Sequence, residues 1–159
     1  MNFCEYYNLY KNTLLNDVMP FWLKYSGDES GAINNCLGED GKLLSRDRYI
    51  WSQGRALWTY SAMYNRMGKD RVYLERADGL FAYLKSIGAN ESGSWNYLYD
   101  GDGKLLEDDI SIYVDGFVLA GMTEYYAATK NPEALDIAIK IFESTNRRMN
   151  TPGSYRVAP

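Results

Sequence analysis

Hydrophobic residues recur along the chain in two alternating patterns. Around residues 49–64 and 111–126, apolar or small residues occupy almost every side of a helix, which is typical of a helix buried all round. Residues 71–87, and the segment that begins at Pro132, each carry a single apolar stripe at helical spacing, which is typical of an outer helix. The first stripe consists of Tyr73, Ala77, Leu80, Phe81 and Leu84, and the second includes Leu135, Ala138, Ile139 and Phe142. The alternation predicts an all-α fold in which inner helices, at about 47–67 and 109–128, are wrapped by outer ones.

Two short segments with turn residues separate these helices. A first helix is predicted over residues 3–25, and Pro20 is expected to kink or restart it. Residues 31–44 place an Asp-Gly pair between two short apolar runs, which predicts a β-hairpin. Residues 93–106 predict a second hairpin, because they end in the same Gly-Lys-Leu-Leu sequence.

The chain therefore contains an internal repeat of hairpin, buried helix and striped helix. The two Gly-Lys-Leu-Leu segments lie 62 residues apart, and residues 153–155 resemble 93–95 at a spacing of 60, so a third unit begins near the C-terminus. Residues 1–159 are predicted to form a single partial α/α domain of roughly two and a half units. Such an arc exposes apolar flanks, so we expect a longer native polypeptide or association with another chain.

The composition narrows the possible functions. The chain has no histidine, which excludes a histidine general base, a Ser-His-Asp triad and a histidine metal site built from this chain alone. The net charge is −4 without a basic run, so a nucleic-acid partner is not expected. No segment reaches the roughly 20 apolar residues of a membrane span. Cys4 and Cys36 form no redox or metal motif and no signal peptide is evident, which favours a cytoplasmic protein.

One charge stands out in the first inner helix. Arg55 is the only charged residue between Tyr49 and Asn65, and burying an unpaired guanidinium is costly. When the inner helices are aligned at the spacing of 62, Arg55 corresponds to Phe117. The arginine thus departs from the pattern of its own repeat, and function is expected at such departures.

Two interpretations of Arg55 remain open from the sequence. It could form a buried structural pair with Asp115, the one charge near the start of the second inner helix. Alternatively it faces an axial cavity and binds a substrate oxygen, beside Trp51 and Trp58 on the same helix face. For Asp115 itself the structural interpretation is favoured.

The same alignment pairs Trp51 with Tyr113 and Gly54 with Gly116. Both aromatic residues follow a hairpin, so they are expected at the N-terminal mouth of the inner layer. The glycines are interpreted as sites of close helix packing. Other conspicuous residues receive structural roles: packing for Trp95, and turn or helix-start roles for the acidic pairs at 39–40 and 108–109.

Three segments of the chain resemble the N-acylglucosamine 2-epimerase family. They read Y-I-W-S-Q-G-R at 49–55, P-F-W-L-K-Y-S at 20–26 and S-I-Y-V-D-G-F-V-L-A-G at 111–121, and the resemblance extends over nearly the whole chain. It implies an (α/α)6 barrel, of which this chain matches the N-terminal part. It also implies a sugar or amino-sugar substrate and no cofactor or metal.

The resemblance implies a reaction in which the C2 proton of an open-chain sugar is removed and returned on the opposite face. It implies that Arg55 holds the sugar oxygen where negative charge develops. Tyr113 is implied to line the pocket, and Trp51 to form its wall or support it. The acid/base histidines of the family have no counterpart here, so we expect this chain to be inactive alone, as a fragment or as one piece of a larger assembly.

Three functions compete at this stage. The first is interconversion of N-acetylglucosamine and N-acetylmannosamine, with cellobiose 2-epimerase and mannose isomerase as alternatives within the family. The second is a glycoside hydrolase or lyase on the same barrel, with Asp115 as the catalytic acid. The third is a carbohydrate-binding arc without catalysis. The expected partner is a second copy of the chain or the remainder of the barrel.

Overall fold

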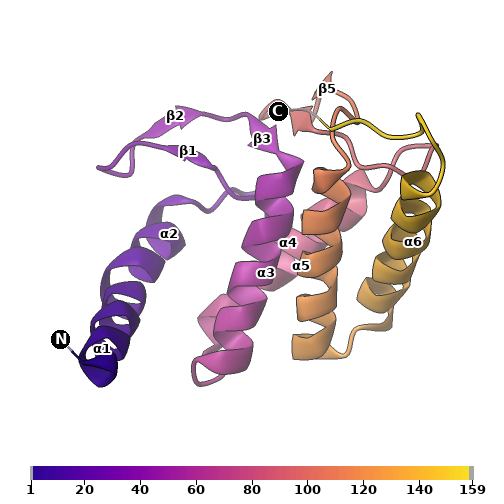
Figure 1. Cartoon of the computed structure of the whole chain (residues 1–159). Coiled ribbons are helices and arrows are strands. Elements are labelled where there is room, and N and C mark those ends of the chain that lie inside the picture. Colours follow the sequence, from indigo (N-terminus) through magenta and orange to yellow (C-terminus); the bar gives the residue numbers. More distant parts are fainter. Residues whose placement is uncertain (1, 158–159) are drawn as a thin grey trace.

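The computed structural model describes residues 2–157 and is predominantly helical, as predicted (Figure 1). The helices are α1 (Phe3–Thr13), the π-helical turn η1 (Leu14–Val18), α2 (Met19–Tyr25), α3 (Ile50–Arg66), α4 (Arg71–Ile87), α5 (Tyr113–Thr129) and α6 (Pro132–Met149). The first three form one continuous helix with a widened turn before Pro20. The predicted restart is confirmed, because regular α-helix begins again at Met19 with Pro20 in its first turn. Proline fits there because it has no N–H to donate to the preceding turn.

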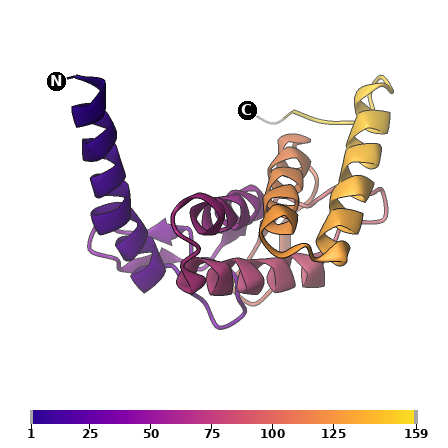
Figure 2. The same ribbon diagram turned by 90° about the horizontal axis from the view of Figure 1, so that it is seen from below.

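The helices lie in an arc of two layers. α3 and α5 pack side by side as the inner pair, and α4 lies across their outer side (Figure 2). α1 and α6 flank them, and the remaining side of α3 and α5 stays open between the flanks. Large apolar side chains are exposed on both flanks, for example Phe3 (84%) and Phe142 (59%), which confirms the predicted open arc. Within the described residues, no helix combines the length and hydrophobicity that crossing a bilayer requires.

Glycines set the distance between the inner helices. A Cβ atom at Gly54 would lie 2.8 Å from backbone atoms of Phe117 and Val118, and one at Gly121 would lie 2.5 Å from the carbonyl oxygen of Gly54. The packing role predicted for Gly54 is therefore confirmed. The same role was wrong for Gly116, where a Cβ atom would meet nothing within 4 Å; Gly121, almost one and a half turns later, makes the contact instead.

Both predicted hairpins are present. β1 (Cys36–Leu37) pairs with β2 (Leu43–Ser45), and β4 (Leu98–Tyr99) pairs with β5 (Leu105–Glu107), both antiparallel. A further strand, β3 (Arg48–Tyr49), was not predicted; it pairs with β4 and ties the second hairpin to the start of α3. The turn glycines Gly41 and Gly103 have φ values of 81° and 86°, which glycine adopts without strain.

The repeat continues at the C-terminus. The N–H of Ile112, before α5, donates to the carbonyl of Arg156 (2.9 Å), as the N–H of Ile50 donates to Tyr97 (3.0 Å). Residues 150–157 thus dock on α5 as the second hairpin docks on α3. They contain a turn but no strand, so the predicted third unit begins here without a hairpin strand.

Two helix details differ from the prediction. α5 begins at Tyr113 and not at residue 109, because the N–H of Tyr97 bonds the carbonyl of Asp108 (2.9 Å) and keeps that backbone in the hairpin. Asp108 and Asp109 are therefore not helix-start residues. In α6 only Ala138 of the predicted stripe is buried, and the side chains turned to the open flank are Leu135, Ile139 and Phe142. In α4 the whole predicted stripe is buried: Tyr73, Ala77, Leu80, Phe81 and Leu84.

The two aligned glycines provide a matched test of this packing. We expect Gly54→Ala to lower the free energy of unfolding by about 1–3 kcal/mol, because its methyl group overlaps the α5 backbone. Gly116→Ala should raise it by roughly 0.5–1 kcal/mol, because alanine is the better helix former and its methyl group meets open space. Urea unfolding followed by circular dichroism measures both. Equal effects of the two substitutions would contradict the glycine contact.

Candidate functional site

Arg55 lies on the open face of α3 and is exposed to solvent. Its guanidinium carbon is 5.3 Å from the centroid of the Phe117 ring on α5, a cation–π distance. Within residues 2–157, the observed ion pairs do not include Arg55. The charge is therefore exposed to solvent and contacts one aromatic ring, and it stays available to an anionic or polar ligand.

A pocket of about 290 Å³ adjoins this guanidinium. Arg55 and Trp58 line it from α3, and Phe117 and Ala120 line it from α5. The pocket thus combines one permanent charge with aromatic and small apolar walls. Such a mixture suits a small ligand that has both polar oxygens and an apolar face.

The other predicted site residues lie next to this pocket or above it. Trp51 is half-buried in the first turn of α3, and its ring centroid is 6.0 Å from that of Phe117. Tyr113 is the first residue of α5 and is 62% exposed, one turn before Phe117. Both therefore lie at the N-terminal ends of the inner helices, as predicted. Neither lines the pocket itself.

Asp115 lies on the opposite side of α5 from the pocket and is only 1% exposed. One carboxylate oxygen accepts a hydrogen bond from Arg148 of α6, and the other accepts the N–H of Trp95 (2.8 Å). Of the two interpretations of Arg55 that the sequence left open, the buried pair with Asp115 is therefore wrong. Each is the one charge in the first half of its helix, which suggested a pair, but the two side chains point to different layers.

The role of Asp115 is explained by its repeat counterpart. Gln53 accepts the N–H of Ile33 (2.8 Å) and donates to the carbonyl of the same residue (2.9 Å). Ile33 and Trp95 are also 62 residues apart, so each inner helix holds its preceding loop with one buried polar side chain. Burial raises the pKa of Asp115, although Arg148 and the N–H of Trp95 oppose that rise. Held in this way, Asp115 does not serve as the acid of a glycoside hydrolase in the pocket.

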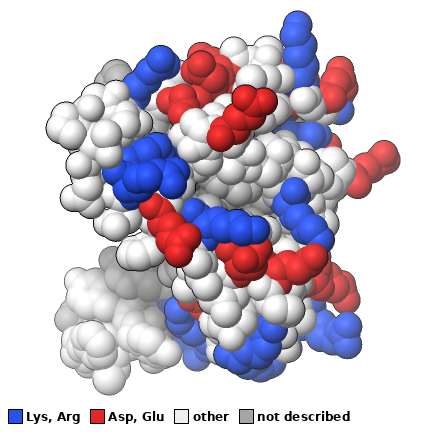
Figure 3. All heavy atoms as spheres, turned by 90° about the vertical axis from the view of Figure 1, so that its right-hand side faces the viewer, with Lys and Arg blue, Asp and Glu red and all other residues white. Residues whose placement is uncertain are grey.

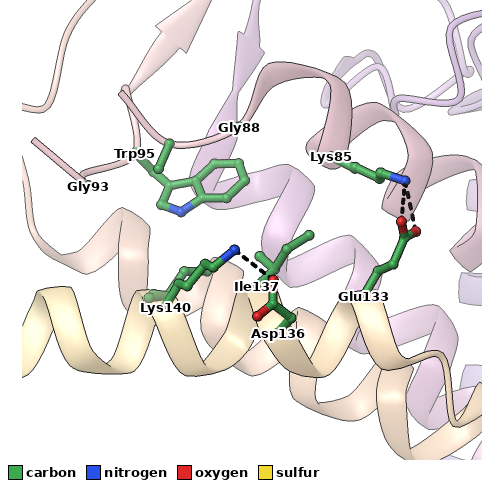
Figure 4. A pocket seen from close by; sticks show the side chains of 10 residues that line it. Lys85, Gly88, Gly93, Trp95, Glu133, Asp136, Ile137 and Lys140 are labelled. Atoms are coloured by element: carbon green, nitrogen blue, oxygen red, sulfur yellow. Dashed lines mark hydrogen bonds and ion pairs between the residues drawn. The ribbon is translucent and has the colours of Figure 1, made fainter. Parts of the chain in front are cut away.

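A larger pocket, of about 450 Å³, lies on the outer side between α4 and α6 (Figure 4). Its charged residues are already paired, Lys85 with Glu133 (2.7 Å) and Lys140 with Asp136 (2.7 Å). Trp95 closes it from the loop and is 2% exposed, which confirms its predicted packing role.

On the face that Figure 3 shows, positive and negative side chains intermingle, so their fields largely cancel. Neither feature extends the Arg55 site.

Sequence reasoning missed three residues of this arrangement. Phe117 and Ala120 form the α5 side of the pocket, and the alignment at 62 could have indicated them because it places them opposite Arg55 and Trp58. Arg148 was missed as the partner of Asp115. Its repeat counterpart is Ser86, and the counterpart of Asp115 is Gln53. Both charged residues of the pair therefore replace uncharged residues of the first repeat.

Comparisons with known proteins agree on one family. The family model for N-acylglucosamine 2-epimerase (GlcNAc 2-epimerase) matches residues 31–157. Cellobiose 2-epimerase of Dictyoglomus turgidum is 30% identical over 135 residues, which cover 82% of this chain and 34% of that protein. N-acylglucosamine 2-epimerase of Mus musculus is 28% identical over 134 residues, which cover 81% of this chain and 32% of that protein.

Solved structures show the same fold. A sugar epimerase from a ruminal bacterium superposes with a TM-score of 0.79 at 26% identity, over 87% of this chain and 36% of that one. Cellobiose 2-epimerase from Bacillus thermoamylovorans B4167 gives 0.79 at 27% identity with the same coverage. D-mannose isomerase, at 20% identity and a TM-score of 0.74, supports the fold alone. The fold is part of an (α/α)6 barrel, and the chain spans about a third of the length of the relatives it matches.

The buried pair can be tested by converting the second repeat to the first. Asp115→Gln and Arg148→Ser should each lower the free energy of unfolding by about 3–5 kcal/mol, because each leaves a buried charge without its partner. The double variant restores the pair of residues found at Gln53 and Ser86. It should therefore lose much less than the sum of the two single variants in urea unfolding. Additive losses would mean that the two side chains are not coupled.

The same variants predict a pH dependence. In Arg148→Ser, burial should keep the pKa of Asp115 above its unfolded value, so the folded state binds the extra proton. Stability is then greatest below the unfolded pKa and falls as the pH rises through the folded pKa. We expect this variant to be more stable at about pH 4 than at about pH 7, relative to the double variant, which has no carboxylate at this site. Thermal unfolding at the two pH values measures the difference.

Proposed function

Because this chain belongs to the N-acylglucosamine 2-epimerase family, we propose that α3 and α5 form one wall of a sugar-binding site in which Arg55 holds a sugar oxygen. The observation that carries the proposal is the exposed guanidinium of Arg55 over the Phe117 ring, outside the ion pairs of residues 2–157. The guanidinium also adjoins the pocket between α3 and α5.

The chemistry suits a fixed cation. In 2-epimerisation a base takes the C2 proton, the C–H electron pair becomes a C1–C2 double bond, and the carbonyl π pair moves onto O1. Negative charge on that oxygen grows only as the proton leaves, so a preplaced guanidinium stabilises the transition state more than the bound sugar. Arginine is charged at any physiological pH, so a guanidinium can stabilise a negative oxygen without a change of protonation.

The aromatic residues at the mouth have supporting roles in this proposal. Tyr113 offers a hydroxyl at the exposed start of α5, where a sugar hydroxyl can meet it. Trp51 packs against Phe117 and thereby fixes the ring under Arg55. We favour N-acetylglucosamine and N-acetylmannosamine as the sugar pair. Cellobiose is the alternative, because several relatives of similar identity are named cellobiose 2-epimerases.

We further propose that residues 1–159 act as one partial domain that does not epimerise sugars by itself. The support is chemical, since the chain has no histidine and the one carboxylate of the inner helices near the mouth, Asp115, is buried against Arg148. In this proposal the base for the C2 proton comes from further helices of the barrel or from another chain.

The absence of turnover can be tested directly. The purified 159-residue chain, incubated in D2O with N-acetylmannosamine or cellobiose, should leave the C2 proton signal unchanged in proton NMR. The expected result follows from the lack of a histidine base. Loss of the C2 signal above the protein-free control would show that the chain carries its own base and would refute the proposal.

Sugar binding by Arg55 is tested with a matched pair of variants. Arg55→Ala should weaken binding of the same sugars about tenfold to a hundredfold, because it removes a hydrogen bond from a charged donor. Arg147→Ala removes an equally exposed arginine from α6 and should change nothing. Saturation-transfer NMR titrations give both dissociation constants. Equal binding by the two variants would remove Arg55 from the site.

A further inference from the structure

We propose that Trp58 is the stacking platform for the apolar face of the sugar whose oxygen Arg55 holds. The inference rests on the proposed function and adds the residue that orients the ring. Trp58 is 43% exposed on the open face of α3, one turn after Arg55, and both side chains line the 290 Å³ pocket. Three residues of helix separate them by about 4.5 Å along the axis, so both side chains can contact one small ligand.

The repeat itself creates the space beside Trp58. At the spacing of 62 residues Trp58 corresponds to Ala120, and both line the same pocket from facing helices. A large ring on α3 therefore faces a methyl group on α5, and the difference in size leaves a hollow between them. Two tryptophans at these positions would fill the hollow. Two alanines would remove its aromatic wall.

A second guanidinium contacts the indole ring and helps to hold it in place. The guanidinium carbon of Arg66 lies 5.6 Å from the Trp58 ring centroid, and Arg66 is bound by Glu124 of α5 (2.9 Å). Glu124 also accepts a hydrogen bond from Asn65 (2.8 Å), and its side chain is only 14% exposed. A ring fixed before the ligand arrives loses little conformational entropy on binding.

The two residues of α3 in this brace have no equivalents in the second repeat. At the spacing of 62, Asn65 and Arg66 correspond to Ala127 and Ala128, which cannot hold a ring or bind a carboxylate. The open face of α3 thus departs from the repeat at the guanidinium, at the indole and at the groups that hold the indole.

The chemistry identifies a neutral sugar face as the occupant. The face of an indole ring carries partial negative charge, and the axial C–H groups of a sugar carry partial positive charge, so the two surfaces attract and exclude water together. Arg55 meanwhile meets the hydroxyl and carbonyl oxygens at the edge of the same ring. A purely anionic ligand would use the guanidinium but gain nothing from the indole.

The test uses the 159-residue chain with N-acetylglucosamine and cellobiose as probes in saturation-transfer NMR titrations. Trp58→Ala should weaken binding at least about tenfold, and Trp58→Phe should stay within about threefold of the unmodified chain, because phenylalanine keeps a flat ring. Arg66→Ala should give an intermediate loss, since the indole remains but is no longer held. Phe142→Ala, which removes a more exposed aromatic ring from α6 (59% against 43% for Trp58), should bind normally.

The outcomes separate this inference from the proposed function. Failure of the unmodified chain to bind either sugar would refute both. Binding that is lost in Arg55→Ala but kept in Trp58→Ala would refute the platform and leave the arginine site intact. Nuclear Overhauser contacts between the Trp58 indole protons and the sugar C–H protons give a readout that a merely structural tryptophan would not produce. Their absence in a bound sample would also refute the platform, even if Trp58→Ala unfolds.

Discussion

The close contact between α3 and α5 is the constraint on which the rest of the structure depends. Gly54 and Gly121 let the two backbones approach until a single methyl group would no longer fit. Only at that separation can Arg55 reach over Phe117 and Trp58 face Ala120 across a small pocket. A wider helix pair would leave the guanidinium in open water and the indole without an opposite wall. The two glycines therefore set the width of the pocket in which we propose that the ligand binds.

One buried polar side chain in each repeat fixes the loop that precedes the inner helix. Gln53 and Asp115 each fix the loop before their helix by bonding its backbone. The amide is neutral and needs no further partner, whereas the carboxylate requires Arg148 because an unpaired buried charge is costly. The second repeat thus carries a charge pair that the first does not need. Its carboxylate belongs to the scaffold, which separates Asp115 from the chemistry of the open face.

Function is proposed where the repeat is broken without a structural reason. The buried sides of α3 and α5 differ at Gln53 and Asp115, where Arg148 accounts for the change, and their open sides differ at Arg55, Trp58 and Arg66. These three residues occupy positions where α5 has Phe117, Ala120 and Ala128. Repeated helices give a scaffold of regular geometry, and in our proposal the residues that differ on one of them give that scaffold its preference for a ligand. Family membership agrees with a sugar as that ligand.

The sequence by itself determined the helix types, the repeat, the hairpins and the departure at Arg55, because periodicity and turn chemistry are local properties. It also indicated the family. Only the tertiary structure decided the partner of Asp115, the start of α5 and the glycine that makes the helix contact. Each of these depends on which residues meet across layers: Arg148 lies 33 residues from Asp115, and the hairpin backbone holds Asp108 out of the helix. Helical spacing gives the face on which a side chain lies, but the neighbouring element decides what it meets there.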